Sequence, residues 1–181
     1  LAGRLWRISG PSFFQVNTVQ AEQLVQTAVR YLDPQEGEEV LDAYCGVGTL
    51  GLTFASRVGY VLGIESSPWS IEDALVNAEN DENVEFAEGA VEEVLPAWEQ
   101  TLNGVVLDPP RAGCAPAALE AMARVRPSRI VYISCDPNTL ARDVARLGDL
   151  GYTLVEVQPV DMFPQTYHIE SVALLKRTHD T

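Results

Sequence analysis

The sequence predicts one α/β domain with a mostly parallel, twisted sheet and helices on both of its faces. From residue 40 onward, short apolar, β-branched segments alternate with segments of helical spacing, which is the pattern of repeated strand–helix units. The last two strand-like segments have no helical segment between them, so we expect them to pair as a C-terminal antiparallel hairpin. The chain has 181 residues and 46% hydrophobic composition, which is enough for a single core.

The first part of the chain precedes this alternation. Residues 1–17 contain glycines and a proline with no regular spacing, so they predict an irregular lead-in from a preceding region, and residues 18–181 predict the domain itself. Apolar side chains recur at helical spacing from Val19 to Leu32, which predicts a helix over residues 18–33.

The later elements follow from residue type and from glycine or proline at their ends. Runs of Val, Ile, Leu and Tyr predict strands at residues 40–44, 60–65, 84–87, 104–108, 129–134, 152–160 and 168–175. Helical spacing, in three cases opened by a proline, predicts helices at residues 49–57, 68–80, 116–125 and 137–147. In such a sheet the ligand site lies at the carboxyl ends of the parallel strands. The candidate loops hold Tyr44–Gly48, Glu65, Asp108–Arg111 and Cys135–Pro137.

The charge is distributed unevenly. The net charge is −14, and residues 34–103 hold fifteen acids against one base, while the remainder is balanced. A nucleic-acid binder is usually basic. If the chain acts on nucleic acid, we therefore expect contact through the balanced, arginine-bearing part or through another domain.

The cysteine and histidine counts exclude several classes of site. Three cysteines without CxxC spacing argue against a disulfide scaffold or a structural zinc site, and two histidines are too few for a typical histidine metal site. No apolar run reaches the roughly 18 residues that span a bilayer. We expect a cytoplasmic protein without a metal, and a monomer is the simplest expectation for its oligomeric state. Cys45 is expected to pack under a turn, and Cys114 to be an incidental loop residue.

A glycine-rich turn follows the strand at 40–44. It reads Gly46-Val-Gly48-Thr-Leu-Gly51, and Glu65 follows nineteen residues after Gly46, at the end of the next strand. Glycines permit a tight turn and close approach of a ligand, and the acid is placed to bind ribose hydroxyls. The pattern favours an adenosine-type cofactor, either a dinucleotide or S-adenosylmethionine, over a merely close-packed turn. Asp42 favours S-adenosylmethionine, because an acid can face a positive sulfonium but repels a pyrophosphate.

Asp108-Pro-Pro-Arg111 ends the strand at 104–108. The prolines stiffen the loop and hold Asp108 at the edge of the sheet. The motif resembles the Asp-Pro-Pro-aromatic loop of amino-methyltransferases, in which the aromatic ring stacks on the target base. Arg111 takes the place of that ring, which indicates a base chemistry other than methylation of an exocyclic amine.

Cys135 ends the strand at 129–134, and Pro137 opens the next helix. Nearby helix N-terminal amides favour a thiolate, so Cys135 is a candidate nucleophile, although a lone cysteine is more often a small buried apolar residue. The adjacent Asp136 is expected to raise the thiol pKa. His168 and Glu170 alternate on the last expected strand, so their side chains should share one face. Glu170 is then either an edge charge or a general base.

Taken in order, these motifs resemble the RNA 5-methyluridine (uracil-5-) methyltransferase family, which includes tRNA and 23S ribosomal RNA enzymes. The resemblance covers nearly the whole chain from Phe13 onward and rests on six motifs. They are Phe13-Phe-Gln-Val-Asn17, Asp42-Ala-Tyr-Cys-Gly-Val-Gly48, Gly63-Ile-Glu65, Asp108-Pro-Pro-Arg111, Ser134-Cys-Asp-Pro137 with Ala141-Arg-Asp143, and Met162-Phe-Pro with His168-Ile-Glu170.

The resemblance implies a Rossmann-like, S-adenosylmethionine-dependent methyltransferase fold and a role for each matching residue. Cys135 matches the nucleophile that adds to uracil, and Glu170 matches the base. The cofactor-binding positions are Gln15, Tyr44, Gly46, Gly48, Thr49, Glu65 and Asp108, and those near the target uracil are Gln15, Asp108 and Arg111. Thr49 and Asp136 stand where family members often have Asn.

The expected function is transfer of a methyl group to carbon 5 of a uridine in rRNA or tRNA through a covalent Cys–uracil adduct. Family members carry an N-terminal RNA-binding domain and a central insert, and some carry an iron–sulfur cluster. We therefore expect RNA to be bound with help from domains outside this sequence. Two other functions remain open, namely an NAD(P)-dependent oxidoreductase and a catalytically inactive cofactor- or RNA-binding module.

Overall fold

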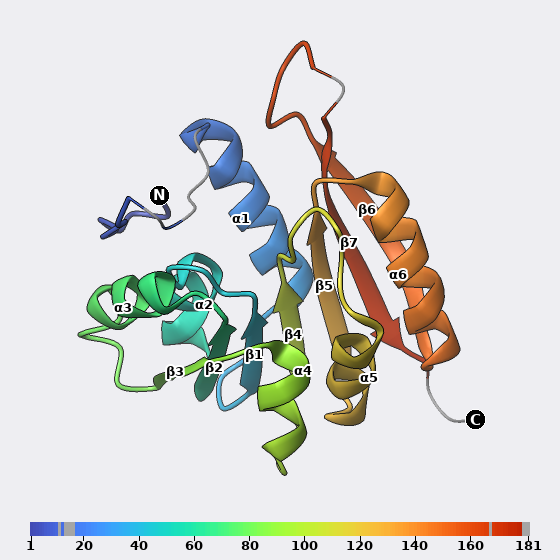
Figure 1. Ribbon diagram of the computed structural model, residues 1–181, viewed down its shortest axis with the longest axis horizontal. Helices are drawn as coiled ribbons and strands as arrows, with labels where there is room; N and C mark the ends of the chain where they lie inside the picture. The colour runs from blue at the N-terminus through green and yellow to red at the C-terminus, as the bar shows by residue number, and fades with distance from the viewer. Residues whose placement is uncertain (11, 13–16, 167, 179–181) are drawn as a thin grey trace.

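A computed structural model describes residues 1–10, 12, 17–166 and 168–178. These residues form a sheet with the strand order β3-β2-β1-β4-β5-β7-β6 (Figure 1). The strands are β1 (Glu39–Ala43), β2 (Tyr60–Glu65), β3 (Val84–Glu88), β4 (Gly104–Leu107), β5 (Arg129–Ser134), β6 (Tyr152–Val160) and β7 (Glu170–Arg177). The helices are α1 (Thr18–Leu32), α2 (Thr49–Phe54), α3 (Pro68–Asn77), α4 (Val91–Val94), α5 (Pro116–Arg124) and α6 (Pro137–Asp149), with 3₁₀ turns η1 (Ala55–Arg57) and η2 (Leu95–Ala97).

The predicted α/β architecture is confirmed. Strands β1 to β5 pair in parallel, and β7 pairs antiparallel with both β5 and β6, which gives the expected C-terminal hairpin. The short helix α4 was not expected, because four residues are too few to produce a helical repeat in the sequence. The last strand begins at Glu170 rather than at His168, since its pairing with β6 ends at Val160 and Glu170.

Apolar side chains fill both faces of the sheet. One buried cluster joins the sheet to α4, α5 and α6, and the other joins it to α1 and α2. Figure 1 shows these two groups of helices on opposite sides of the strands, with α3 beside α2. Among the described helices, none combines the length and apolar character needed to cross a membrane.

The chain reverses its direction of travel across the sheet between β1 and β4. From β1 it adds β2 and β3 on one side, and then returns to place β4 on the other side of β1. Loops that leave the carboxyl ends of two such strands diverge and leave a crevice between them. The glycine-rich turn after β1 and the Asp108 loop after β4 therefore border the same opening.

A short N-terminal segment is tied to one side of α3. We call Arg4–Gly10 together with Ser12 the strap. Its hydrogen-bonded partners on and after α3 are spaced four residues apart, with Ser9 and Ser12 bound to Asp73, Arg7 bound to Asn77, and Arg4 bound to Asp81. Asn77 also donates to the Val47 carbonyl at 3.0 Å, so the strap is linked to the glycine-rich turn.

Asp73 is the buried anchor of the strap. Its carboxylate accepts from the Ser9 amide at 2.6 Å and the Ser12 hydroxyl at 2.7 Å, and Arg7 Nε lies 3.1 Å away. Burial opposes ionisation, but these donors outweigh it and lower the pKa of Asp73 below its ordinary value of 3.8. The ionised Asp73 carboxylate and its donors therefore stabilise the fold above pH 3.8. This stabilisation is lost as the pH falls through the lower pKa that Asp73 has in the folded state.

Replacing Asp73 with alanine is expected to release the strap. Loss of several hydrogen bonds to one charged group should raise amide hydrogen exchange in the strap by about tenfold or more. Glu72→Ala is the matched control, because Glu72 is the exposed neighbour on the same helix. Equal exchange in the two variants, measured by mass spectrometry at pH 7, would contradict the anchoring role.

Candidate active site

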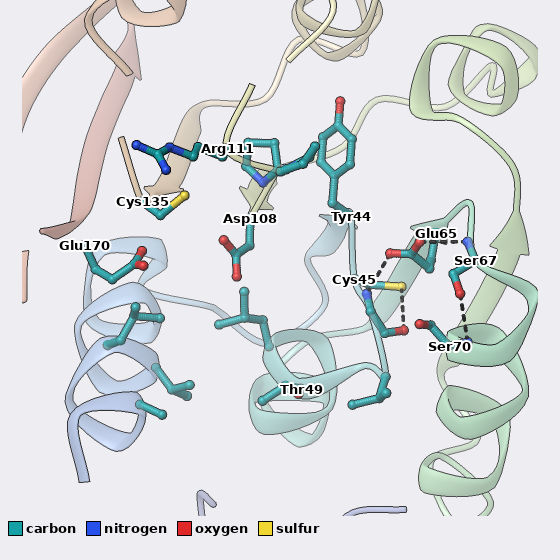
Figure 2. A pocket seen from close by; sticks show the side chains of 18 of the residues that line it. Tyr44, Cys45, Thr49, Glu65, Ser67, Ser70, Asp108, Arg111, Cys135 and Glu170 are labelled. Atoms are coloured by element: carbon teal, nitrogen blue, oxygen red, sulfur yellow. Dashed lines mark hydrogen bonds between the residues drawn. The ribbon is translucent and has the colours of Figure 1, made fainter. Parts of the chain in front are cut away.

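A cavity of ≈ 610 Å³ opens at the carboxyl ends of the parallel strands (Figure 2). Its lining includes Tyr44, Gly46, Thr49, Glu65, Asp108, Arg111, Cys135 and Glu170, all of which the sequence assigned to the site. Gly48 is not part of the lining, but it is the N-cap residue of α2. Gln15 lies outside the described residues. A cavity of this size is in the range that holds small-molecule ligands.

The glycine-rich turn forms one wall. Gly48 has φ +86°, a backbone angle that favours glycine, and a Cβ atom built there would lie 3.0 Å from Leu52 and 3.1 Å from Phe86, so the packing is also tight. Tyr44 adopts φ +60°, which is uncommon for a residue with a side chain. Backbone strain of this kind is held by surrounding structure and concentrates at functional sites.

Glu65 lies at the end of β2, beside this turn. Its carboxylate accepts from the Gly46 amide at 3.1 Å and from the Ser67 amide at 2.8 Å. The two backbone donors fix the carboxylate at the edge of the cavity, where Figure 2 shows it on the side opposite Cys135. Further lone pairs remain for ligand hydroxyls, since a carboxylate has about four acceptor positions.

Asp42 corrects one expectation, because it does not face the cavity. It is fully buried beneath the turn, and one of its oxygens accepts from the Gly51 amide at 2.7 Å, which fixes the start of α2. Burial raises its pKa to about 7, against the opposing effect of the Gly51 hydrogen bond. The acids that face a ligand are instead Glu65, Asp108 and Glu170.

The other end of the cavity brings Cys135 and Glu170 together. Ser134, the last residue of β5, pairs with Ser171 of β7, so continuation of the antiparallel register sets the following residue, Cys135, opposite Glu170. Asp108 follows β4, the neighbour of β5 on its other side. Figure 2 shows the side chains of Cys135, Asp108 and Glu170 at this same end of the cavity.

The pKa values of these three groups are raised. Burial has the largest effect on the Cys135 thiol, followed by the negative charges of Glu170 and Asp108, while Arg111 acts in the opposite direction. Burial followed by Glu170 and Asp42 raises the pKa of Asp108 to about 7. Burial also raises the pKa of Glu170. The site therefore holds a thiol beside two carboxyl groups with raised pKa values, of which Asp108 can exchange protons near neutral pH.

The groups with the largest effects on the pKa of the Cys135 thiol do not include Asp136. Asp136 caps α6, with one oxygen accepting from the Asn138 amide at 2.9 Å, and Arg111 Nε lies 3.5 Å from its other oxygen. The Asn138 amide, ahead of smaller contributions from Thr139 and Arg111, lowers the pKa of this carboxylate. Its charge is directed toward the helix end and Arg111, and the acids that raise the Cys135 pKa are Glu170 and Asp108.

Two further expectations are corrected. His168 precedes β7 and does not share a strand face with Glu170; its ring packs edge-on against Phe163, with 6.2 Å between centroids. Cys114 is not an incidental loop residue, since it is buried and its amide donates to Asp143 at 2.8 Å. Cys45 is buried at the turn as expected.

Other lining residues were not identified from the sequence. Ser67 and Ser70 come from the start of α3, and Ala21, Leu24 and Val25 come from α1. Of the α1 residues, only Leu24 belonged to the helical spacing seen in the sequence, and that spacing does not distinguish a core position from a cavity wall.

The charged residues that line the cavity favour S-adenosylmethionine over a dinucleotide. Glu65, Asp108 and Glu170 line the cavity against one base, Arg111. Such a lining repels the two phosphate groups of a dinucleotide and accommodates the sulfonium of S-adenosylmethionine. Within the described residues, no group of three or more His, Cys, Asp or Glu side chains is arranged to hold a metal ion.

Comparisons with known proteins agree with this arrangement. Residues 3–178 match the model of the tRNA (uracil-5-)-methyltransferase family. The chain is 46% identical over 178 residues to an uncharacterized RNA methyltransferase of Thermosynechococcus vestitus, covering 97% of this chain and 40% of that protein. It is 50% identical over 173 residues to one of Oceanobacillus iheyensis, covering 93% of this chain and 38% of the relative. The chain thus spans about two fifths of the length of these relatives.

Solved structures give the same result. The tRNA (uracil-54, C5)-methyltransferase of Pyrococcus abyssi, in complex with S-adenosyl-L-homocysteine, has a TM-score of 0.82 and 41% identity, covering 94% of this chain and 41% of that one. Precorrin-6y C5,15-methyltransferase of Geobacter metallireducens has a TM-score of 0.78 at 16% identity, covering 96% and 94%, and shows the fold alone. The predicted Rossmann-like methyltransferase fold is confirmed. The family match over nearly the whole chain, at this level of identity, means that the chain belongs to the tRNA (uracil-5-)-methyltransferase family.

Proposed function

We propose that this domain transfers a methyl group from S-adenosylmethionine to carbon 5 of a uridine in RNA, with Cys135 as the nucleophile and Glu170 as the base. The observation that carries the proposal is the register of β5 and β7, which sets the thiol opposite a buried carboxyl group at the end of the cavity. Carbon 5 of uracil is a weak nucleophile, and a neighbouring thiol supplies the activation it requires.

The chemistry uses these two side chains in turn. The Cys135 thiol loses its proton to solvent, and its sulfur bonds to carbon 6 of the uracil. The electron pair of the 5,6 double bond then makes carbon 5 nucleophilic. S-adenosylmethionine, when bound, supplies the electrophilic methyl group that carbon 5 then carries. Glu170 removes the remaining proton from carbon 5, the 5,6 double bond re-forms, and the Cys135 sulfur leaves from carbon 6.

The cofactor would lie along the wall of the cavity that is formed by the glycine-rich turn and Glu65. We assign its binding to Tyr44, Gly46, Gly48, Thr49, Glu65 and Asp108, with Gln15 as a further position outside the described residues. Gly48 acts by shaping the turn rather than by lining the cavity. Asp108 and Arg111 border both the cofactor side and Cys135, so we assign them, with Gln15, to the uracil as well.

Glu65→Gln is expected to weaken cofactor binding. Replacing a charged acceptor by a neutral one should raise the Kd for S-adenosylhomocysteine by about 10- to 100-fold, the range for a hydrogen bond to a charged group. Glu88→Gln is the matched control, because Glu88 pairs with Glu65 across β2 and β3 but is exposed and outside the cavity lining. Equal affinity of the two variants in calorimetry would contradict the assignment.

The RNA target and the other partners also belong to the proposal. Since the chain spans about two fifths of its relatives, we propose that the RNA, tRNA or rRNA, is selected with help from regions outside this sequence. A cytoplasmic location fits the three cysteines, all of which are free thiols.

The test is a methyl-transfer assay with the full-length protein, together with a map of 5-methyluridine in cellular tRNA and rRNA with and without the gene. Loss of one or a few 5-methyluridine sites supports the proposal. An unchanged map and no transfer to either RNA would instead indicate an inactive cofactor- or RNA-binding module, and tight NAD binding without S-adenosylmethionine binding would indicate an oxidoreductase.

A further inference from the structure

A buried carboxylate on α6 joins three separate segments behind the reactive end of the cavity. Asp143 is 2% exposed. Its Oδ2 accepts from the Cys114 amide at 2.8 Å and from the Tyr132 hydroxyl at 2.6 Å, and its Oδ1 accepts from Arg142 Nε at 2.8 Å. These donors come from the loop after β4, from β5 and from α6 itself. Both oxygens of the buried Asp143 carboxylate therefore accept hydrogen bonds, which offset the cost of burying its charge.

The loop between β4 and α5 is the segment that depends on this anion. A Cβ atom at Gly113, which has φ +75°, would lie only 2.5 Å from Asp143 Oδ2, so the loop approaches the carboxylate as closely as a glycine backbone allows. Arg142 donates to the Ala112 carbonyl at 2.9 Å, and Thr139 donates to the Arg111 carbonyl at 3.2 Å. The loop that begins at Asp108 is thus held to α6 at Arg111, Ala112 and Cys114.

The same helix begins two residues after Cys135, at Pro137, so the attachment fixes the loop relative to the thiol. The network also extends toward Tyr44, another residue that lines the cavity. The Cys114 thiol lies 3.7 Å from the Tyr132 hydroxyl and contributes to the raised pKa of Tyr44, after burial, so it is close to the Tyr44 hydroxyl as well. None of these contacts reaches into the space where a cofactor or uracil would bind, since Asp143 is not part of the cavity lining.

We infer that Asp143 is a positioning residue, which holds the Asp108–Arg111 segment against α6 so that Asp108 and Arg111 stand beside Cys135 during addition to the uracil. The inference rests on the proposed function for its effect on turnover, but not for its effect on the thiol. Displacement of a catalytic group by about 1 Å can lower a rate by about 100-fold, so a contact outside the substrate site can control turnover.

The test compares Asp143→Asn with Asp149→Asn, which makes the same chemical change at an exposed position of the same helix. In Asp143→Asn we expect kcat to fall by about 10- to 100-fold, with a smaller rise in the Kd for S-adenosylhomocysteine, because Asp108 also borders the cofactor. Tyr132→Phe, which removes one donor, should give a smaller loss of kcat in the same direction. Asp149→Asn should match the unmodified protein in each measurement.

A second readout separates positioning from general loss of stability. The pH profile of iodoacetamide alkylation, followed by mass spectrometry on the peptide that contains Cys135, reports the charges around this thiol. Asp108 raises the thiol pKa more than Arg111 lowers it. Release of the loop should therefore move the profile to lower pH in Asp143→Asn.

Unchanged kcat and an unchanged alkylation profile in Asp143→Asn would overturn the inference, as would a tenfold rise in the Kd for S-adenosylhomocysteine with no shift of the profile. If Asp143→Asn fails to fold, Tyr132→Phe decides between the same outcomes. If the unmodified protein methylates no RNA, the proposed function fails on its own, and the alkylation profiles still decide the positioning role.

Discussion

Cys135→Ser is expected to abolish methyl transfer while S-adenosylhomocysteine still binds. A serine hydroxyl is a poorer nucleophile toward carbon 6 and a poorer leaving group from it, so both the first and the last step fail. The loss in kcat should be about 10⁴-fold or more, the scale seen when the nucleophile of a covalent mechanism is removed. Single-turnover transfer of a labelled methyl group to RNA measures the loss.

Trapping with RNA that contains 5-fluorouridine tests the same residue independently. Because the fluorine at carbon 5 cannot be removed as a proton, the protein–RNA adduct should persist in denaturing gels with the unmodified protein and be absent with Cys135→Ser. The Kd for S-adenosylhomocysteine serves as the internal control, since Cys135 lies at the end of the cavity away from Glu65. A serine variant that keeps more than about a tenth of the activity would exclude covalent catalysis by this residue.

Glu170→Gln is expected to stop the reaction after methyl transfer, at the removal of the carbon 5 proton. The glutamine can fill the same space but cannot take the proton from carbon 5, so the covalent complex with ordinary uridine RNA should accumulate in the presence of S-adenosylmethionine. Turnover should fall by about 10³-fold, within the usual contribution of a general base. Denaturing gels measure the accumulated complex, and multiple-turnover transfer measures the rate.

The pH dependence supplies a second measurement for Glu170. Burial raises its pKa above the ordinary value of 4.5, so the active, ionised form is lost as the pH falls through that raised value, and kcat should fall with it. Ionisation of a group with a raised folded-state pKa lowers the stability of the fold as the pH rises. Glu170→Gln should therefore be at least as stable as the unmodified protein at pH 7, which rules out unfolding as the cause of lost activity.

Glu156→Gln is the matched control for Glu170, because Glu156 is an exposed glutamate on the neighbouring strand β6. It should leave turnover and the pH profile unchanged. A Glu170→Gln variant that turns over normally, or one that forms no adduct at all, would remove Glu170 from the role of base. The second result would instead place it in the step that activates the thiol.

Local sequence patterns predicted most of the secondary structure. The strands at Tyr60–Glu65, Arg129–Ser134 and Tyr152–Val160 have the expected bounds, because runs of β-branched residues end at glycine, proline or a polar residue there. Pro68, Pro116 and Pro137 each open a helix as expected, since proline fits the first turn of a helix. The helix at α4 was missed because it is too short to carry a periodic signal.

The candidate site was predictable where chemistry depends on residues close together in the chain. The glycine-rich turn with Glu65, the Asp108 loop and Cys135 each follow a strand, and the common direction of parallel strands brings strand ends to one edge. The direction in which the side chain of a neighbouring acid points was not predictable in this way. Asp42 and Asp136 both lie beside motif residues, yet one is buried under the turn and the other caps a helix.

The sequence by itself determined the fold class, the strand–helix order and the set of reactive side chains, because these depend on residue type and local periodicity. The tertiary structure alone decided which of those side chains meet. A shift of one residue in the pairing of β5 with β7 would turn Glu170 to the other face of the sheet, since side chains alternate with a period of two. The approach of Asp143 to Gly113 likewise depends on how a helix packs over a loop thirty residues away, and no local pattern encodes that distance.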